Sequence, residues 1–159
     1  MSPQPNLQSG APGTLLGAPQ QRGDDTLNFS RIEPSENVRL ADVEMAMANL
    51  LSQKDDVMTS AALYHLRSGG GRVRADLALK SARALRLSRQ ITIAISAACE
   101  LLHNASLVHD DLQDGDASRR GEIAVWKKFG PNTAICLGDL MVSAAYSAIA
   151  SASTDHLPE

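Results

Sequence analysis

Cysteines are few in this sequence, and basic residues are not in excess. The two cysteines, Cys99 and Cys136, each lie in an apolar stretch, and neither has the spacing of a metal-ligand motif. A disulfide framework is therefore not expected. The formal net charge is −3, which argues against a basic surface for nucleic acid or for an anionic membrane. We expect a protein of a reducing compartment with no nucleic-acid partner.

The sequence also lacks an uninterrupted apolar run long enough to cross a membrane. Its longest apolar stretches are broken by Glu100, His103 and Asp139, and no basic segment followed by an apolar core stands at the N-terminus. This pattern predicts neither a membrane span nor a signal peptide. Together with the two cysteines, it predicts a cytoplasmic protein.

The 159 residues divide into two parts. Residues 1–35 hold five of the seven prolines and four of the eleven glycines and show no hydrophobic periodicity, which predicts a disordered leader. Residues 36–159 show helical spacing of apolar residues, without β alternation or an internal repeat. We therefore predict one all-α domain, a helical bundle.

Glycines, prolines and polar residues separate the predicted helices. Ser35 and Ser88 are candidate helix caps, and three successive glycines at 69–71 predict a tight loop. Helices are expected at about 36–53, 59–67, 73–87, 89–114, 123–129 and 131–151, with a polar loop at 115–121. Residues 91–108 are apolar on nearly every face of their helix, which is typical of a helix buried among others.

Three aspartates lie at the end of this central helix. Asp110 and Asp114 are four residues apart and share one helix face, and Asp111 stands beside them. Like charges at this spacing repel each other, so their presence favours a bound cation. Mg²⁺ is typically held by one or two carboxylates together with substrate phosphates. The alternative is a solvated acidic helix end.

A histidine lies on the same stripe of the helix. His103 precedes Asp110 by seven residues, which places it within about 20° of the same face and roughly 10 Å away. The helix therefore directs an imidazole and an acidic cluster toward one cavity. A lone histidine on an apolar helix would more often be a hydrogen-bonded core residue.

Two cationic segments flank the helix. Residues 69–74 read Gly-Gly-Gly-Arg-Val-Arg, and residues 118–121 read Ser-Arg-Arg-Gly. Glycines allow the backbone to approach an anion, and arginine offers a planar donor fork to phosphate oxygens. The pair predicts two diphosphate sites, although each segment alone also fits an ordinary solvated surface.

Taken together, these segments resemble the trans-isoprenyl diphosphate synthase (polyprenyl synthetase) family. The motifs occur in the family's order without gaps, over residues 36–150, and they include residues 100–103, 106–114, 129–130 and 137–139. The resemblance implies the N-terminal half of a helical isoprenoid synthase fold. It implies a prenyltransferase that condenses an allylic diphosphate with isopentenyl diphosphate, and a homodimer or a pairing with another synthase chain.

The resemblance also implies roles for individual residues. Asp110, Asp111 and Asp114 match the first aspartate-rich motif, which holds the allylic diphosphate through Mg²⁺. Arg119 would grip the same diphosphate. The diphosphate of isopentenyl diphosphate would be held by Arg74, His103 and Arg120, and Arg72 belongs to the same glycine-arginine motif.

Two departures separate this sequence from the family pattern. Gly71 and Ala75 stand where the family motif has lysine and proline, so one cation of the isopentenyl site is missing. The second aspartate-rich motif of the family does not occur within these 159 residues. We therefore expect the isolated chain to bind Mg²⁺-diphosphate weakly and to catalyse little unless a second polypeptide supplies the rest.

Other interpretations remain at this level. The chain could be a non-catalytic partner or regulatory subunit of a complete synthase, or an inactive fragment. A terpene cyclase also carries an aspartate-rich helix, but it generally lacks the glycine-arginine motif and the histidine seven residues before the first aspartate.

Product length in this family is limited by side chains just before the first aspartate. Ala105 and Ser106 are small where farnesyl-forming relatives generally carry an aromatic ring. An open channel and products of C20 or longer are therefore expected. The alternative is that Ala105 merely allows close helix packing.

The missing lysine can be tested by restoring it. Gly71→Lys should tighten binding of isopentenyl diphosphate more than binding of an allylic diphosphate, because charge-assisted contacts contribute roughly 1.5–3 kcal/mol. Calorimetric titration of both ligands measures the difference. Unchanged affinity for isopentenyl diphosphate would contradict this alignment of the loop.

Overall fold

The structure, a computed structural model, describes residues 37–52 and 56–153. Within these residues the chain forms an all-α bundle with one pair of very short strands, which confirms the predicted fold class. The elements are α1 (Leu40–Leu51), α2 (Val57–Arg67), α3 (Val73–Ala84), α4 (Arg89–Asp114), β1 (Ser118–Arg119), β2 (Glu122–Ile123), α5 (Val125–Phe129) and α6 (Pro131–Ser153).

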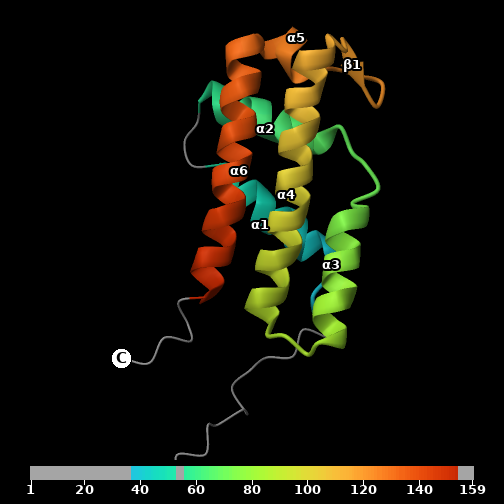
Figure 1. Ribbon diagram of the computed structural model, residues 1–159, viewed down its shortest axis with the longest axis vertical. Helices are drawn as coiled ribbons and strands as arrows, with labels where there is room; N and C mark the ends of the chain where they lie inside the picture. Colours follow the sequence, from blue (N-terminus) through green and yellow to red (C-terminus); the bar gives the residue numbers. More distant parts are fainter. Residues whose placement is uncertain (1–36, 53–55, 154–159) are drawn as a thin grey trace, which may run out of the picture.

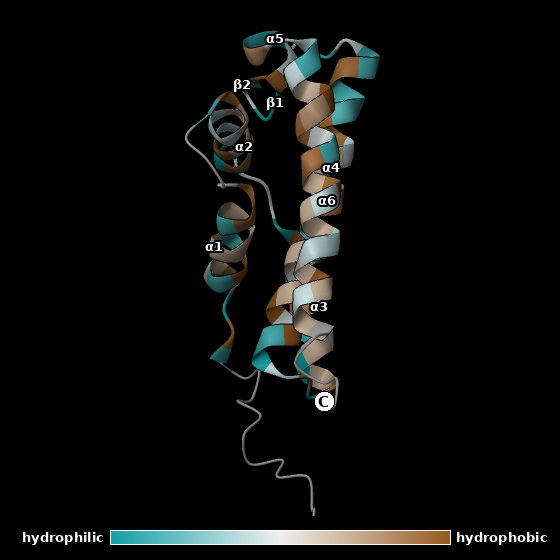
Figure 2. Ribbon diagram, turned by 90° about the vertical axis from the view of Figure 1, so that its left-hand side faces the viewer, coloured by the Kyte–Doolittle hydropathy of each residue, from teal (hydrophilic) through white to brown (hydrophobic). Residues whose placement is uncertain are grey.

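The helices form two layers. The long helices α4 and α6 lie side by side, with α3 next to the first half of α4 (Figure 1). Seen from the side, α1 and α2 make the second layer (Figure 2). Helix α4 contacts α1, α3, α5 and α6, so it is the central element of the bundle.

Local sequence defines both ends of α4. The Ser88 side chain accepts a hydrogen bond from the Ile91 backbone N–H at 3.3 Å, as expected for an N-cap residue. At the other end, Gly115 takes a left-handed conformation with φ 71°, which glycine adopts without a steric penalty. The predicted bounds of this helix and its cap are confirmed.

The hydrophobic core lies between the two layers. Helix α4 contributes Leu101 and Val108, α6 contributes Leu137 and Met141, and α1 contributes Met47, all of them at most 1% exposed. Each apolar side chain removed from water in this way stabilises the fold by about 1.5–3 kcal/mol. Since three helices share this core, α4 cannot move without exposing it.

A glycine of α6 leaves room for a histidine of α4. A Cβ atom at Gly138 would overlap the imidazole of His109, whose Nε2 lies 3.2 Å from the Ile135 carbonyl oxygen and 3.8 Å from Asp139 Oδ1. A larger residue at position 138 would therefore displace the His109 ring from this position.

Several element boundaries differ from the sequence prediction. Helix α1 begins at Leu40, with Arg39 as its N-cap residue and Asp42 accepting a hydrogen bond from the Arg39 N–H at 2.8 Å. The helix therefore does not start beside Ser35, which lies, like the predicted leader 1–35, outside the described residues. Helix α3 ends at Ala84 rather than near 87, and the predicted loop 115–121 contains β1.

By length and composition alone, α4 and α6 could cross a membrane. Length and composition are weak evidence for a membrane span, because the core helix of a water-soluble protein can have both. More than half of the apolar stretch of α4 is buried inside this bundle. Helix α4 also buries Glu100, Asn104 and Asp111. Its apolar character is thus accounted for by the core.

Two neighbouring leucines of α4 provide a matched test of the packing. Leu101 is fully buried, whereas Leu102 is 44% exposed. Leu101→Ala should lower the free energy of unfolding by about 2–5 kcal/mol because it leaves a cavity. Leu102→Ala should cost less than about 1 kcal/mol. Urea titration followed by circular dichroism measures both, and equal losses would contradict this orientation of α4.

Candidate functional site

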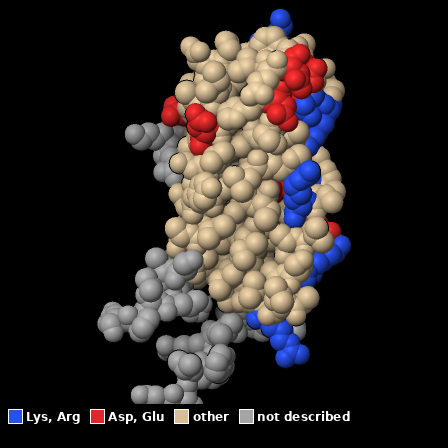
Figure 3. Space-filling view, viewed as in Figure 1, with Lys and Arg blue, Asp and Glu red and all other residues tan. Residues whose placement is uncertain are grey.

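The three aspartates at the end of α4 do not share one environment. Asp110 and Asp114 are exposed, whereas Asp111 is 1% exposed. Acidic side chains gather near this end of the molecule, beside a line of basic side chains that runs down one edge (Figure 3). The structure thus brings two of the three predicted metal-ligating residues together on the surface and turns the third inward.

Asp111 forms an ion pair with Arg119. Its Oδ1 atom accepts hydrogen bonds from the Arg119 guanidinium, with Nε at 2.5 Å. The hydrogen bond that Arg119 donates to Asp111 raises the pKa of Arg119, with further contributions from the charges of Asp116 and Asp110. The ion pair therefore fixes Arg119 beside the exposed carboxylates.

A tight hairpin presents the two neighbouring arginines. Strands β1 and β2 pair antiparallel, and the two residues between them, Arg120 and Gly121, both have positive φ values of 55° and 85°. A two-residue turn with this backbone matches the twist of the strands. The hairpin is anchored by the Tyr64 hydroxyl, which donates to the Ile123 carbonyl oxygen at 2.8 Å.

The hairpin touches the glycine loop that precedes α3. The Arg120 guanidinium donates a hydrogen bond to the Gly69 carbonyl oxygen. A Cβ atom at Gly70 would lie 2.6 Å from Arg120 Cζ, and Gly70 has a φ of 131°, a conformation that L side chains rarely adopt. Gly71 has an ordinary φ, and a Cβ atom there would lie 3.2 Å from Val73 Cγ2, a tight contact that the exposed Val73 side chain can relieve by a small shift. The loop thus requires glycine at 70 but accepts a side chain at 71.

The predicted cations of the isopentenyl site lie together. The pKa of His103 is lowered, first by partial burial and next by the nearby positive charges of Arg74, Arg120 and Arg119. Burial also lowers the pKa of Arg120, and Arg72 and Arg119 add to this effect. The arginines thus disfavour added positive charge on His103 and Arg120, so the cluster favours an anion.

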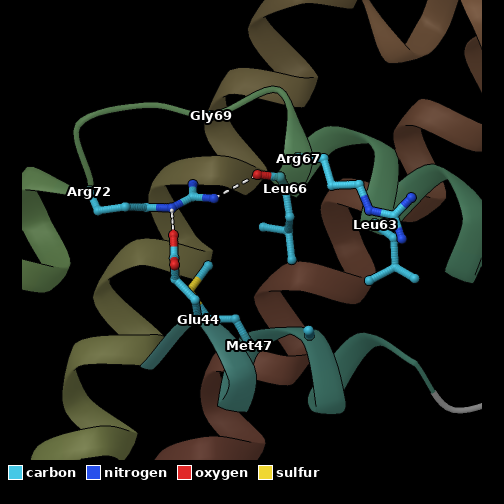
Figure 4. A pocket seen from close by; sticks show the side chains of 8 residues that line it. Glu44, Met47, Leu63, Leu66, Arg67, Gly69 and Arg72 are labelled. Atoms are coloured by element: carbon cyan, nitrogen blue, oxygen red, sulfur yellow. Dashed lines mark hydrogen bonds and ion pairs between the residues drawn. The ribbon is translucent and has the colours of Figure 1, made fainter. Parts of the chain in front are cut away.

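Arg72 differs from the other arginines because it is a buried structural residue, 7% exposed. Its Nε donates to Glu44 Oε1 at 2.9 Å, and its Nη2 donates to the Leu66 carbonyl oxygen at 2.7 Å (Figure 4). It also lines a cavity of about 500 Å³ between α1, α2 and the glycine loop, together with Met47. These contacts support the loop from behind and leave Arg72 little freedom to bind a ligand.

A buried polar network behind the cation cluster was not predicted from the sequence. Glu100, on α4, accepts a hydrogen bond from the Ala75 backbone N–H at 3.1 Å. The Asn104 amide nitrogen lies 3.3 Å from Glu100 Oε1, and its Oδ1 lies 3.1 Å from His65 Nε2. The available signal was the pair Glu100 and Asn104, two polar residues four positions apart within an apolar helix.

Within residues 37–52 and 56–153 no group of three or more His, Cys, Asp or Glu side chains is arranged as a metal site. Asp110 and Asp114 nevertheless fit Mg²⁺, because this ion is often held by one or two carboxylates, with water and phosphate oxygens completing its shell. Asp111 is already occupied by Arg119.

Of the two small residues before the aspartates, Ala105 is buried in the core at 2% exposure, whereas Ser106 is exposed. The burial of Ala105 agrees with the packing alternative. The expected product length stays a prediction.

The chain belongs to the polyprenyl synthetase family: the family model matches residues 55–158. The resemblance carried by the motifs is thus confirmed, and with it the isoprenoid synthase type of helical fold. The bundle is similar to the geranyltranstransferase of Thermotoga maritima, with a TM-score of 0.67 and 30% sequence identity over 72% of this chain and 44% of that one.

Curated relatives match over part of their length. The chain is 39% identical over 97 residues to a geranylgeranyl pyrophosphate synthase of Geoglobus acetivorans, covering 61% of this chain and 30% of that protein. It is 34% identical over 123 residues to the farnesyl diphosphate synthase of Buchnera aphidicola, covering 76% of this chain and 42% of that protein. The chain therefore spans less than half the length of these relatives.

The buried His65 gives the protein a pH dependence. Burial lowers its pKa from 6.5 to about 4, although the Asn104 hydrogen bond opposes the shift. On lowering the pH, the unfolded chain binds a proton near pH 6.5, whereas the folded chain does so only near pH 4. The contribution of neutral His65 to stability is thus complete above pH 6.5 and is lost as the pH falls to 4, by roughly 3 kcal/mol.

His65→Gln removes the titrating group and keeps a side-chain N–H donor for Asn104. Between pH 7 and pH 4, the free energy of unfolding of the parent should therefore fall by roughly 3 kcal/mol more than that of the variant. Urea titrations at a series of pH values measure both curves. Parallel curves would contradict a buried neutral His65.

Proposed function

We propose that this chain supplies the allylic-diphosphate and isopentenyl-diphosphate sites of a prenyl diphosphate synthase. The observation that carries the proposal is the cluster of Arg74, His103, Arg119 and Arg120 beside the exposed Asp110 and Asp114, in a chain of the polyprenyl synthetase family. The reaction would be isoprenoid chain elongation, as the names of the matched relatives suggest. The cytoplasm remains the proposed location.

The two diphosphates would be held on different sides of the cluster. Arg119, fixed by Asp111, lies toward the aspartates and would contact the allylic diphosphate. Arg74, His103 and Arg120 would contact isopentenyl diphosphate. Arginine suits these positions because its planar fork can bind two phosphate oxygens at once.

Mg²⁺ would be held by Asp110 and Asp114 with oxygens of the allylic diphosphate. When bound, the ion supplies neutralisation of the negative charge that develops on the leaving diphosphate. The protein residues orient the two substrates, and the ion pair of Arg119 keeps that guanidinium in place without rearrangement during the reaction.

Pairing with a further synthase chain, or a homodimer, is a second proposal. It is motivated by large apolar side chains that α4 and α6 leave exposed: Leu102, Ile135, Tyr146 and Ile149 at 44–70%. Such exposure on one face favours association. Light scattering with and without a full-length relative tests it, and a monomer that ignores the relative would exclude this role.

The metal assignment has a direct test. Asp110→Asn and Asp114→Asn should each weaken Mg²⁺-dependent binding of an allylic thiolodiphosphate by at least about tenfold, because each removes a charged oxygen ligand. Calorimetric titration in Mg²⁺ and in a chelator measures the effect.

Asp139→Asn is the matched control. Asp139 is also an exposed carboxylate, with 73% of its side chain accessible, but it belongs to α6 and lies near His109. Its substitution should leave binding nearly unchanged. Equal losses of affinity in all three variants would contradict the metal assignment and indicate a general effect of negative charge.

A further inference from the structure

The buried carboxylate of Glu100 stands at the junction of α4 with the segment that carries Arg74. Its two oxygens contact residues that lie on either side of Arg74 along the chain. Oε2 accepts a hydrogen bond from the Ala75 N–H at 3.1 Å, and Oε1 lies 3.7 Å from Arg72 Nη1. Glu100 is 2% exposed and Arg72 is 7% exposed. The ion pair is therefore poorly screened by solvent.

This contact replaces an ordinary helix cap. Arg72 is the N-cap residue of α3 but makes no side-chain cap hydrogen bond, and its φ of 45° is left-handed. The first N–H groups of a helix need acceptors from elsewhere, and Glu100 provides one from a different helix. The family motif has proline at the position of Ala75, and proline has no N–H. The hydrogen bond to Glu100 is therefore possible only because this chain departs from the family motif at Ala75.

We propose that Glu100 is a positioning residue for Arg74 in the isopentenyl diphosphate site, an inference that rests on the proposed function. The loop before α3 has positive φ at Gly69, Gly70 and Arg72, so its own backbone preferences do not define the path of the chain. The carboxylate ties Arg72, two residues before Arg74, and Ala75, directly after it, to the central helix. Arg74 itself stays exposed for the ligand.

A double-mutant cycle separates positioning from a general loss of stability. The variants are Glu100→Gln, Arg74→Ala and the two combined, titrated calorimetrically with isopentenyl diphosphate and, separately, with an allylic thiolodiphosphate. Arg74→Ala should weaken isopentenyl diphosphate binding about tenfold or more. Glu100→Gln should weaken it severalfold, with less effect on the allylic ligand, and should add nothing in the Arg74→Ala background.

Two further variants control for a general disturbance of the fold. Ser96→Ala alters a buried polar side chain one turn before Glu100, whose hydroxyl has no hydrogen-bond partner in the described part of the chain, and it should leave both affinities unchanged. Ala75→Pro removes the N–H but keeps the charge of Glu100, in a first helical turn that tolerates proline. It should weaken isopentenyl diphosphate binding by less than Glu100→Gln does.

The outcomes separate a failure of the proposed function from a failure of the positioning role of Glu100. If Arg74→Ala binds isopentenyl diphosphate as the parent does, or the parent does not bind it, the proposed function fails and the positioning role fails with it. If Arg74→Ala weakens binding but Glu100→Gln does not, or the two losses add, only the positioning role is overturned. If Glu100→Gln does not fold, the Ala75→Pro variant decides. An unchanged affinity of Ala75→Pro for isopentenyl diphosphate would then overturn the positioning role.

Discussion

The burial of α4 is the constraint on which the rest of the structure depends. This helix is packed against α1, α3, α5 and α6, and its apolar residues fill the space between the two layers. A helix held on several sides cannot rotate or slide without opening cavities, which are costly. The groups at its C-terminal end are therefore placed by the core, before any of them meets a ligand.

Two buried carboxylates of α4 attach a hairpin and a loop to this helix. Asp111 binds Arg119 of the hairpin, and Glu100 binds the start of α3. Burying an ion pair carries a desolvation cost that can exceed its attraction, so these pairs are better understood as fixing geometry than as adding stability. Each holds one cationic segment against the same rigid helix.

How much of this arrangement could be predicted depends on the range of the interactions involved. The class, the bounds of α4 and its Ser88 cap follow from local patterns, and they were predicted correctly. The prediction placed the start of α1 near Ser35, because serine is a preferred helix cap. In the structure the helix begins after Arg39, whose backbone N–H donates to the Asp42 side chain. The hairpin was missed because its two-residue turn places an arginine at positive φ, where side chains are uncommon.

The site shows the same division. Helical geometry separates Asp111 from Asp110 by about 100°, so the two side chains leave the helix in different directions. Which of them is buried depends on Arg119, a contact outside the helix. The burial of Arg72 and Ala105 could not be predicted for a similar reason. Their positions match family motifs or look suited to a channel, but their burial is decided by α1, α2 and the core.

The charges at the end of α4 also explain why the two proposed diphosphate sites would differ in their need for a metal. Asp110 and Asp114 are exposed and carry no ion pair among the described residues, so an anion beside them is repelled unless a cation lies between. Besides burial, the positive charges of Arg74 and Arg120 lower the pKa of His103, and those of Arg72 and Arg119 lower the pKa of Arg120, so an anion beside these groups relieves an unfavourable concentration of positive charge directly. Dependence on Mg²⁺ is therefore expected for the allylic ligand and not for isopentenyl diphosphate.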